Sequence, residues 1–325
     1  MSHPACKIKP AILAHIVSSL SGLEQARVGH TPWSAAGPLA SLHRLRKQFR
    51  LPRTLALAIL AASLAPAGVF KENIEFATVE SGEKLTLDAW IPDGPGPFPA
   101  VIVVHGGGFI NGDKQTYVKP LFDPLKSSGF AWFTINYRLA PKVHFPVPQQ
   151  DLGRAIKWVK ANAAQYKVDP RKIALMGESA GASITAYVAV HPGPGEEVSA
   201  VVNLYGVYDW VQRSKQRDGL GANLAKLLDL PNELTEPTLK TLKNISPITY
   251  LSKNTPPFYL IHGTRDFQVP YDQSVLMCEE MKKVGASCEL LTLPGGGHGM
   301  GGWEKIPGLT IYKEKMIQWL KQTWK

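Results

Sequence analysis

The sequence predicts an α/β fold with a mostly parallel central sheet, opened by an antiparallel hairpin and covered by helices. Three observations lead to this prediction. Two early segments alternate apolar and polar residues, as half-buried antiparallel strands do. Later segments are short, continuous apolar runs, which are typical of strands covered on both faces. Segments with apolar residues at helical spacing lie among these runs, so that strands and helices alternate along the chain.

The predicted elements can be placed in order. The hairpin strands are expected at 74–80 ("IEFATVE") and 84–92 ("KLTLDAWIP"). Helices are expected at 151–167, near 271–284 and at 309–325, where apolar residues recur every three or four positions. The buried strands are expected at 100–105, 130–138, 170–177, 199–206, 256–263 and 288–295.

One region breaks this rhythm. Residues 211–246 are polar and in part helical in pattern, and they lie between two predicted buried strands. We expect them to form a small inserted cap. The region contains no long apolar run.

Composition narrows the possible functions. The chain has 325 residues, is 44% hydrophobic and carries a formal net charge of +10. Residues 1–70 hold eight Lys or Arg and one acidic residue, Glu24, so most of the positive charge lies there. The remainder shows no dense Lys/Arg cluster interleaved with aromatic residues, and we expect no binding to nucleic acid.

The N-terminal part resembles a targeting segment. A basic run at 44–54 precedes an apolar run at 55–64, and Ala65 and Ala67 then stand at small-residue cleavage positions. Ten apolar residues are too few to span a bilayer as a helix, so no stable membrane anchor is expected. We expect a signal peptide at 44–67, a non-native or disordered extension at 1–43, and a catalytic domain at 68–325 in the periplasm or outside the cell. The alternative is that the apolar run is a buried helix.

The pentapeptide Gly177-Glu178-Ser179-Ala180-Gly181 has the pattern G-x-S-x-G. In a nucleophile elbow, the serine occupies a strained turn between a strand and a helix, and the flanking glycines let strand and helix approach each other. The alternative reading is an ordinary glycine turn. The pentapeptide alone does not decide between them.

Polar residues that follow the other strands decide in favour of the elbow. In open α/β sheets, ligands bind beyond the carboxyl ends of the strands. "HGGGF" follows the strand at 100–105, Ser179 follows the strand at 170–177, Asp266 follows 256–263 and His298 follows 288–295. Serine, acid and histidine thus come in the order of a hydrolase catalytic triad.

Other polar residues are alternatives for the acid, for binding or for the base. Asp272 is the alternative to Asp266 as the acid, and Asp209 is a further candidate for binding because it also follows a strand. His105 is expected to support the glycine loop rather than to act as a base. The nine histidines show no metal-ligand spacing, and no metal or cofactor is expected.

From about Ile74 onward the chain resembles an α/β-hydrolase of the hormone-sensitive-lipase-like esterase group. The motifs that carry the resemblance are "HGGGF", "NYRLAP", "GESAG", "LIHGTRD" and "GGGHG", in family order. Within the group, the stretch at 244–270 and the leading hairpin look most similar to bacterial acetyl-xylan and feruloyl-type carbohydrate esterases. The larger lipase-like members have an N-terminal helical cap where this chain has its leader, so a more open acyl pocket is expected.

Each residue then has an expected role. Ser179 attacks the ester carbonyl, His298 acts as general base, and Asp266 orients His298. Backbone N–H groups of Gly107, Gly108 and Ala180 form the oxyanion hole. The expected activity is hydrolysis of short-chain acyl esters, of small molecules or of plant polysaccharide. A catalytically silent binding protein and a serine peptidase or amidase of the same fold are the alternatives, and the oligomeric state is left open.

Two cysteines are expected to pair. Cys6 lies in the leader, which leaves Cys278 and Cys288 in an oxidising compartment if the protein is exported. A helix ending near Gly285 and a strand returning from it bring the two residues level with each other. Two buried free thiols are the alternative.

Overall fold

The computed structural model describes residues 67–325, and every structural statement below concerns this part of the chain. The expected extension at 1–43, nearly all of the expected signal peptide at 44–67, and Cys6 lie outside the described residues. Export and the leader's role therefore stay predictions.

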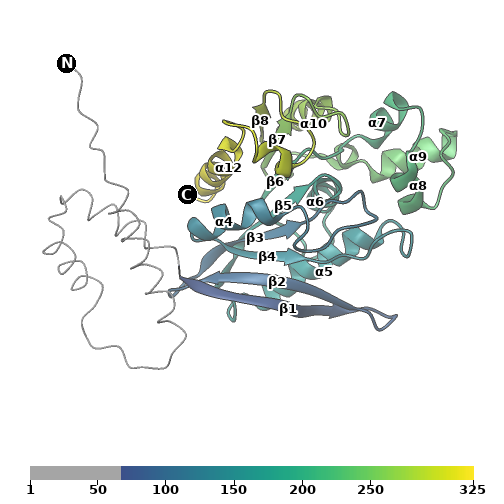
Figure 1. Ribbon diagram of the computed structural model, residues 1–325. Helices are drawn as coiled ribbons and strands as arrows, with labels where there is room; N and C mark the ends of the chain where they lie inside the picture. The colour runs from purple at the N-terminus through teal and green to yellow at the C-terminus, as the bar shows by residue number, and fades with distance from the viewer. Residues whose placement is uncertain (1–66) are drawn as a thin grey trace, which may run out of the picture. The chain divides into compact units, whose positions relative to one another are not determined.

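An eight-stranded sheet forms the centre of the described part (Figure 1). Its strands lie in the order β1-β2-β4-β3-β5-β6-β7-β8. The pairs β1–β2 and β2–β4 are antiparallel, and all the others are parallel. A mostly parallel sheet opened by an antiparallel hairpin was predicted, and this prediction is confirmed.

The strands are β1 Gly68–Thr78, β2 Lys84–Pro92, β3 Phe98–Val104, β4 Ala131–Ile135, β5 Val168–Glu178, β6 Ala200–Leu204, β7 Phe258–Gly263 and β8 Cys288–Leu293. The helices are α4 Lys119–Ser127, α5 Val147–Ala161, α6 Ala180–Val190, α7 Trp210–Gln216, α8 Ala222–Leu228, α9 Glu236–Ile245, the 3-10 helix η1 Pro247–Tyr250, α10 Asp272–Lys283, α11 Met300–Trp303 and α12 Ile311–Thr323.

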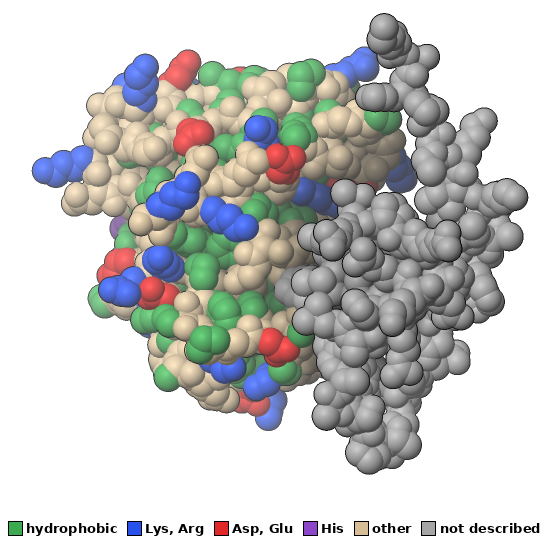
Figure 2. All heavy atoms as spheres, turned by 90° about the vertical axis from the view of Figure 1, so that its left-hand side faces the viewer, with side chains coloured by type: hydrophobic (Ala, Val, Ile, Leu, Met, Phe, Trp, Pro, Cys, Tyr) green, Lys and Arg blue, Asp and Glu red, His purple; other side chains and the backbone are tan. Residues whose placement is uncertain are grey.

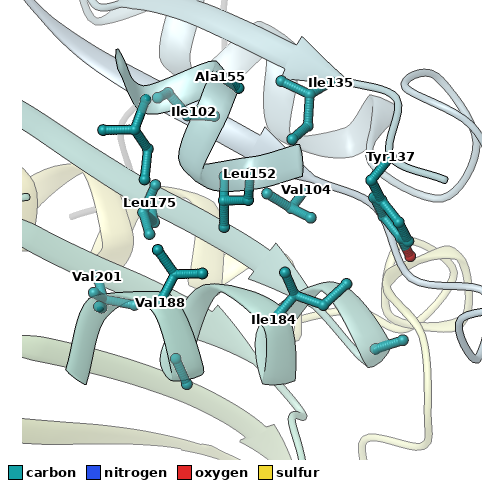
Figure 3. Packing of buried hydrophobic residues seen from close by; sticks show 14 of the residues in the cluster. Ile102, Val104, Ile135, Tyr137, Leu152, Ala155, Leu175, Ile184, Val188 and Val201 are labelled. Atoms are coloured by element: carbon teal, nitrogen blue, oxygen red, sulfur yellow. The ribbon is translucent and has the colours of Figure 1, made fainter. Parts of the chain in front are cut away.

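Helices cover both faces of the sheet, which explains the continuous apolar runs of its central strands. In β3, Ile102 and Val104 belong to the core beneath α5 and α6, which Figure 3 shows. Val101 and Val103 belong to the opposite core, beneath α4 and α12. Because neighbouring side chains on a strand point to opposite faces, a strand buried on both faces needs an apolar residue at every position.

The boundaries differ from prediction in a few places. The strand expected at 130–138 ends at Ile135, because the side chain of Asn136 turns to bind the backbone N–H of Lys114 and the hydroxyl of Thr86. The helix expected from Asp151 begins four residues earlier, at Val147. Helix α4 was not predicted: it has Pro120 near its start and Pro124 inside it, and proline normally disfavours a helix interior.

Three helices, α7, α8 and α9, occupy the region between β6 and β7 where a cap was expected. Asp209 is the N-cap of α7, and its side chain accepts a hydrogen bond from the backbone N–H of Gln212. The structure therefore gives Asp209 a helix-capping role. Its role as a candidate binding residue stays a prediction.

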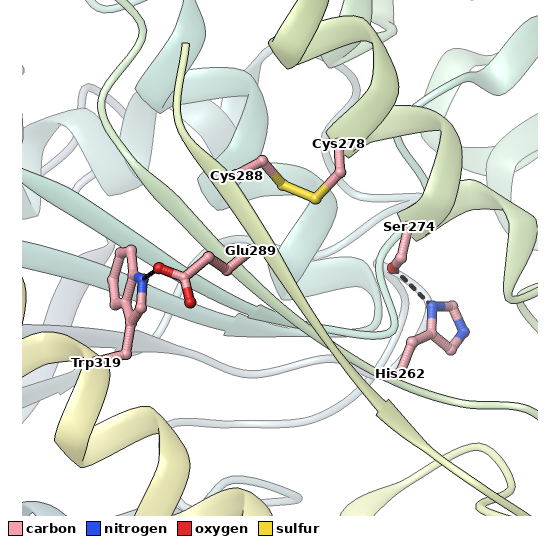
Figure 4. The surroundings of a disulfide bond; sticks show 6 residues. All are labelled: His262, Ser274, Cys278, Cys288, Glu289 and Trp319. Atoms are coloured by element: carbon pink, nitrogen blue, oxygen red, sulfur yellow. Dashed lines mark hydrogen bonds between the residues drawn. A yellow bond between two sulfur atoms is a disulfide. The ribbon is translucent and has the colours of Figure 1, made fainter.

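A disulfide joins Cys278 on α10 to Cys288 at the start of β8 (Figure 4). Their Cα atoms lie 5.1 Å apart, within the usual span of a disulfide. The expected pairing of the two cysteines is therefore present. It fastens a helix to the edge strand of the sheet.

The surface carries charges of both signs. On the face shown in Figure 2, Lys and Arg side chains are interspersed with Asp and Glu. The expectation that the chain does not bind nucleic acid stays a prediction. None of the helices described in residues 67–325 has the length and apolar character that a membrane crossing requires.

Candidate active site

Ser179 lies at the sharp turn between β5 and α6. Its backbone has φ of +53°, a strained conformation for a residue that is not glycine. A side chain at Gly177 would collide with the carbonyl oxygen of Gly181 and the hydroxyl of Thr185, and one at Gly181 would collide with the carbonyl oxygen of Val104. Both glycines are thus required for the strand and helix to pack this closely, as the elbow pattern predicted.

The structure brings Ser179, His298 and Asp266 together. Ser179 Oγ lies 2.9 Å from Nε2 of His298, and Nδ1 of His298 lies 2.7 Å from Oδ2 of Asp266. His298 Nδ1–H therefore donates to Asp266, which leaves Nε2 as the acceptor for the serine hydroxyl. The order serine–histidine–carboxylate is the geometry that general-base activation of a serine requires.

Asp266 is held as a buried carboxylate. Its Oδ1 accepts hydrogen bonds from the backbone N–H groups of Gln268 and Val269, both at 2.9 Å. Burial by itself would raise the pKa of Asp266, but hydrogen bonds from His262 and His298 outweigh it and hold the pKa well below its usual value. The rival acid, Asp272, accepts a hydrogen bond from the side chain of Gln216, and within residues 67–325 it has no hydrogen bond to a histidine.

His262 is a second histidine beside Asp266 that the sequence analysis did not single out. It is fully buried, with Nε2 3.0 Å from the carbonyl oxygen of Val269 and 3.4 Å from Asp266 Oδ2. Because both neighbours are acceptors, Nε2 carries a proton. Nδ1 lies 2.7 Å from the hydroxyl of Ser274 on α10, as Figure 4 shows. The spacing His262–Asp266 within "HGTRD" was the sequence signal for this contact.

The glycine loop after β3 lies beside Ser179. Gly107 and Gly108 have φ of +93° and +63°, and a side chain at Gly107 would collide with the backbone of Asn111. Among the described residues, no hydrogen bond uses the backbone N–H of either glycine. Ala180 is the first residue of α6, where backbone N–H groups have no partner inside the helix. Gly107, Gly108 and Ser179 line the same cavity, and Ala180 directly follows Ser179. The oxyanion role of the three N–H groups stays a prediction.

Glu178, directly before Ser179, supports this loop. The N–H of Gly106 donates to Glu178 Oε1. Burial raises the pKa of Glu178, while this hydrogen bond and the hydroxyl of Tyr205 oppose the rise. Glu178 and Tyr205 were both missed as site residues, although "NLYG" ends a predicted strand and the strand-end criterion applied to Tyr205 as well.

Tyr205 also positions the histidine loop. Its hydroxyl accepts a hydrogen bond from the backbone N–H of Met300 at 3.1 Å, and its ring packs edge-on against His298 with centroids 4.7 Å apart. Tyr205 has φ of +44°, which is rare for a bulky residue. A strained residue that touches a reactive side chain is typical of functional sites.

His105 has the supporting position expected of it. Its ring stacks on Tyr137, with centroids 4.3 Å apart, and Nδ1 donates to the carbonyl oxygen of Gly106 at 2.8 Å. Its Nε2 has no hydrogen-bond partner within the described residues. Burial lowers the pKa of His105 to about 4, against the opposing effects of Gly106 and Asp113.

A cavity of about 1190 Å³ opens at Ser179 and His298. Many of the side chains that line the cavity are polar, and Tyr117 and Met300 also line it. The polar side chains that line it, apart from those already described, are Asn111, Asp113, Lys114, Gln115, Thr116, Lys119, Asn136, Asn223 and Gln268. In residues 67–325, no three His, Cys, Asp or Glu side chains lie close enough together to hold a metal ion.

Comparison with known sequences gives one family and several relatives. The sequence model of a family described as BD-FAE matches residues 87–281. Esterase LipC of Mycobacterium tuberculosis (strain ATCC 25618 / H37Rv) is 33% identical over 220 residues, which cover 62% of this chain and 53% of that protein. Esterase LipQ of the same strain is 32% identical over 231 residues, covering 67% and 54%. The chain thus spans about half the length of these curated relatives.

Solved structures agree on the fold. A truncated carbohydrate esterase from gut microbiota is 26% identical, with a TM-score of 0.69 and coverage of 80% of this chain and 97% of that one. An acetyl ester-xyloside bifunctional hydrolase from Caldicellulosiruptor lactoaceticus is 25% identical, with a TM-score of 0.66 and the same coverage. The expected α/β-hydrolase fold and the resemblance to esterases, with carbohydrate esterases among the structural neighbours, are confirmed.

Proposed function

The chain belongs to the BD-FAE family, and from this premise we propose that the protein is a serine carboxylic-ester hydrolase acting on short acyl esters of small molecules or carbohydrates. One observation carries the proposal: Ser179 Oγ, His298 and Asp266 form a continuous hydrogen-bonded series, and Ser179 and His298 line a cavity of about 1190 Å³. The named esterases among its relatives support the same reaction class.

In the first half-reaction, His298 Nε2 takes the proton of Ser179 as Oγ attacks the ester carbonyl carbon. The tetrahedral intermediate collapses when the bond to the alcohol oxygen breaks, and His298 gives its proton to that oxygen. An acyl-enzyme ester on Ser179 remains. Water then attacks it with His298 again as general base, which releases the acid and restores the serine hydroxyl.

The negative charge that develops on the carbonyl oxygen needs donors already in place. We assign this role to the N–H groups of Gly107, Gly108 and Ala180. Such donors are fixed before the reaction, and losing one typically costs about 3 kcal/mol of transition-state stabilisation. Asp266 stabilises the imidazolium form of His298 and keeps Nδ1 protonated.

Short acyl groups are proposed because the cavity wall is rich in amide, hydroxyl and charged side chains. A long alkyl chain placed against them would leave buried polar groups without partners, which costs free energy. The sequence of the α7–α9 region likewise contains no long apolar run.

A panel of esters tests the proposal. Acetyl and butyryl p-nitrophenyl esters are expected to have a higher kcat/KM than the sixteen-carbon ester, and Ser179→Ala should abolish turnover of all of them. A higher kcat/KM on the sixteen-carbon ester would contradict the acyl assignment. Hydrolysis of peptide or anilide substrates with no ester turnover would show an amidase instead.

A further inference from the structure

Tyr117 is an exposed aromatic residue in a strained backbone conformation on the wall of the Ser179 cavity. It is 52% exposed and has φ of +67°. An aromatic residue with positive φ is rare, and exposing a large apolar ring to water is unfavourable as well. Among the described residues, its ring pairs with no other aromatic ring. Strained residues of this kind cluster at active sites and ligand-binding positions.

The loop around Tyr117 is built to hold the ring in place. Asp113 Oδ1 accepts hydrogen bonds from the backbone N–H groups of Gln115 and Thr116, both at 2.8 Å, and from the hydroxyl of Thr116 at 2.9 Å. The hydroxyl of Tyr117 donates to Asn111 Oδ1 at 3.3 Å. A ring fixed before binding loses little entropy when a ligand packs on it.

Other side chains of the same cavity offer unused hydrogen-bonding groups. Among the described residues, the amides of Asn223 and Gln268 and the ammonium group of Lys119 have no hydrogen-bond partner. A primary amide provides two donors and an acceptor. These groups suit a ligand that has several hydroxyls.

A sugar ring offers both an apolar face for the ring of Tyr117 and hydroxyls for the free amide and ammonium groups. One of its faces presents C–H groups, which pack on the electron-rich face of an aromatic ring, and its edge presents hydroxyls. We propose that Tyr117 is the stacking face for the sugar ring that forms the alcohol half of the ester, with the amides of Asn223 and Gln268 and the Lys119 ammonium group binding its hydroxyls. This proposal rests on the ester-hydrolase function proposed above.

A second hollow continues from this position. Gln115 and Lys119 line both the cavity and a neighbouring hollow of about 380 Å³, whose wall includes Phe70, Phe122 and Trp132. Phe122 stacks on Trp132 with ring centroids 4.4 Å apart, and Phe70 is 44% exposed. The hollow therefore provides an aromatic surface for the next sugar ring, and the favoured substrate is an acylated oligosaccharide.

The test compares two substitutions of similar size in the full chain. Tyr117→Leu removes the aromatic face, and Tyr117→Phe keeps it. The quantity measured is kcat/KM on acetylated xylo-oligosaccharides divided by kcat/KM on p-nitrophenyl acetate, so a general loss of folded enzyme cancels. We expect Tyr117→Leu to lower this ratio about tenfold. Tyr117→Phe should keep the ratio within about twofold, the net effect of one exposed hydroxyl contact.

Phe267 supplies the matched control, because it is 87% exposed and does not line the cavity. Phe267→Leu should leave the ratio unchanged. An unchanged ratio in Tyr117→Leu, or an equal fall in Phe267→Leu, would overturn the assignment. So would a fall on methyl ferulate rather than on the acetylated sugars, which would place the acyl group on Tyr117.

Two further measurements, on the wild-type chain and on a variant of the second hollow, complete the test. Turnover of p-nitrophenyl acetate without turnover of acetylated sugars would overturn the sugar site and leave the proposed esterase function standing. Absence of both would reject the esterase function itself. Phe70→Leu should lower kcat/KM on acetylated trisaccharides more than on acetylated monosaccharides. An equal effect on both would overturn the second subsite.

Discussion

Glu178 accepts a hydrogen bond from the backbone N–H of Gly106, and this contact joins the nucleophile turn to the glycine loop. Glu178 is the last residue of β5, and Gly106 follows the neighbouring parallel strand β3. The carboxyl ends of the two strands therefore lie on the same side of the sheet. Glu178 is buried, and a side chain at Gly106 would collide with its carboxylate. The Glu178 carboxylate therefore helps to set the position of the proposed oxyanion donors relative to Ser179, together with the Tyr137 hydroxyl, which donates to the carbonyl oxygen of Gly106.

Glu178→Ala is expected to lower kcat on p-nitrophenyl acetate about tenfold to a hundredfold, because the loop that carries Gly107 and Gly108 loses its anchor. KM should change little. Glu178→Gln keeps an acceptor oxygen at the same place and should lose much less. Steady-state kinetics measures both effects, with circular dichroism to check the fold, and wild-type kcat in folded Glu178→Ala would disprove the role.

His262→Phe should lower both stability and kcat. The substitution leaves the Ser274 hydroxyl and the carbonyl oxygen of Val269 without their buried hydrogen-bond partner, which typically costs about 1–3 kcal/mol, and it removes the second histidine contact of Asp266. A less firmly held Asp266 orients His298 less well, and we expect kcat to fall about tenfold. Ser274→Ala serves as the control, since it removes only the hydrogen bond between Ser274 and His262 and leaves the contact of His262 with Asp266 in place. Urea denaturation measures the loss of stability, and steady-state kinetics measures the loss of kcat. An unchanged kcat would limit His262 to a packing role.

Acid should destabilise the protein through His105. The pKa of His105 is about 4 when folded, and histidine in the unfolded chain has a pKa of about 6.5. Between these values the unfolded chain binds more protons, so stability falls as pH is lowered through this window and His105 contributes no further fall below it. The contribution amounts to about 3 kcal/mol.

The His105→Phe variant isolates this effect. Phenylalanine retains a ring against Tyr137 but cannot take up a proton. Urea denaturation at pH 7 and pH 4.5 should show a smaller loss of unfolding free energy for the variant than for the wild type. Equal losses in the two proteins would exclude His105 as the source.

The disulfide should contribute about 3 kcal/mol to stability, as the chain-entropy treatment gives for a loop of this length. Cys278 and Cys288 are ten residues apart in sequence. Reduction should therefore lower the urea midpoint of the wild type and have no effect on the double variant Cys278→Ser, Cys288→Ser. Alkylation of both thiols in protein never exposed to a reductant would show that the bridge is absent.

We propose export of the protein on the basis of the leader pattern at 44–67. Expression in a bacterial host should then yield a mature chain that begins near Gly68, in the periplasm or the medium. N-terminal sequencing of the purified protein measures this directly. A chain that begins at Met1, or that stays in the cytoplasm, would contradict it.

The sequence was sufficient to predict the features that repeat or that follow strand ends. Alternation located the hairpin, apolar runs located the parallel strands, and Ser179, Asp266 and His298 each follow a strand, where a parallel sheet collects its functional residues. What it did not predict depends on tertiary contacts. The roles of His262 and Glu178 come from partners on other elements, Ser274 and Gly106. Helix α4 was not predicted because it contains two prolines. Tyr117 is identified as a candidate only by its positive φ and its exposure, which the sequence does not reveal.

We propose that Ser179 is the residue that forms the acyl-enzyme. Incubation with an organophosphate ester or a fluorophosphonate, followed by proteolysis and mass spectrometry, identifies the residue that carries the adduct. We expect one adduct per chain, on Ser179, no adduct in Ser179→Ala, and loss of p-nitrophenyl acetate hydrolysis in step with labelling. An adduct on another residue, or wild-type turnover by Ser179→Ala, would contradict the claim.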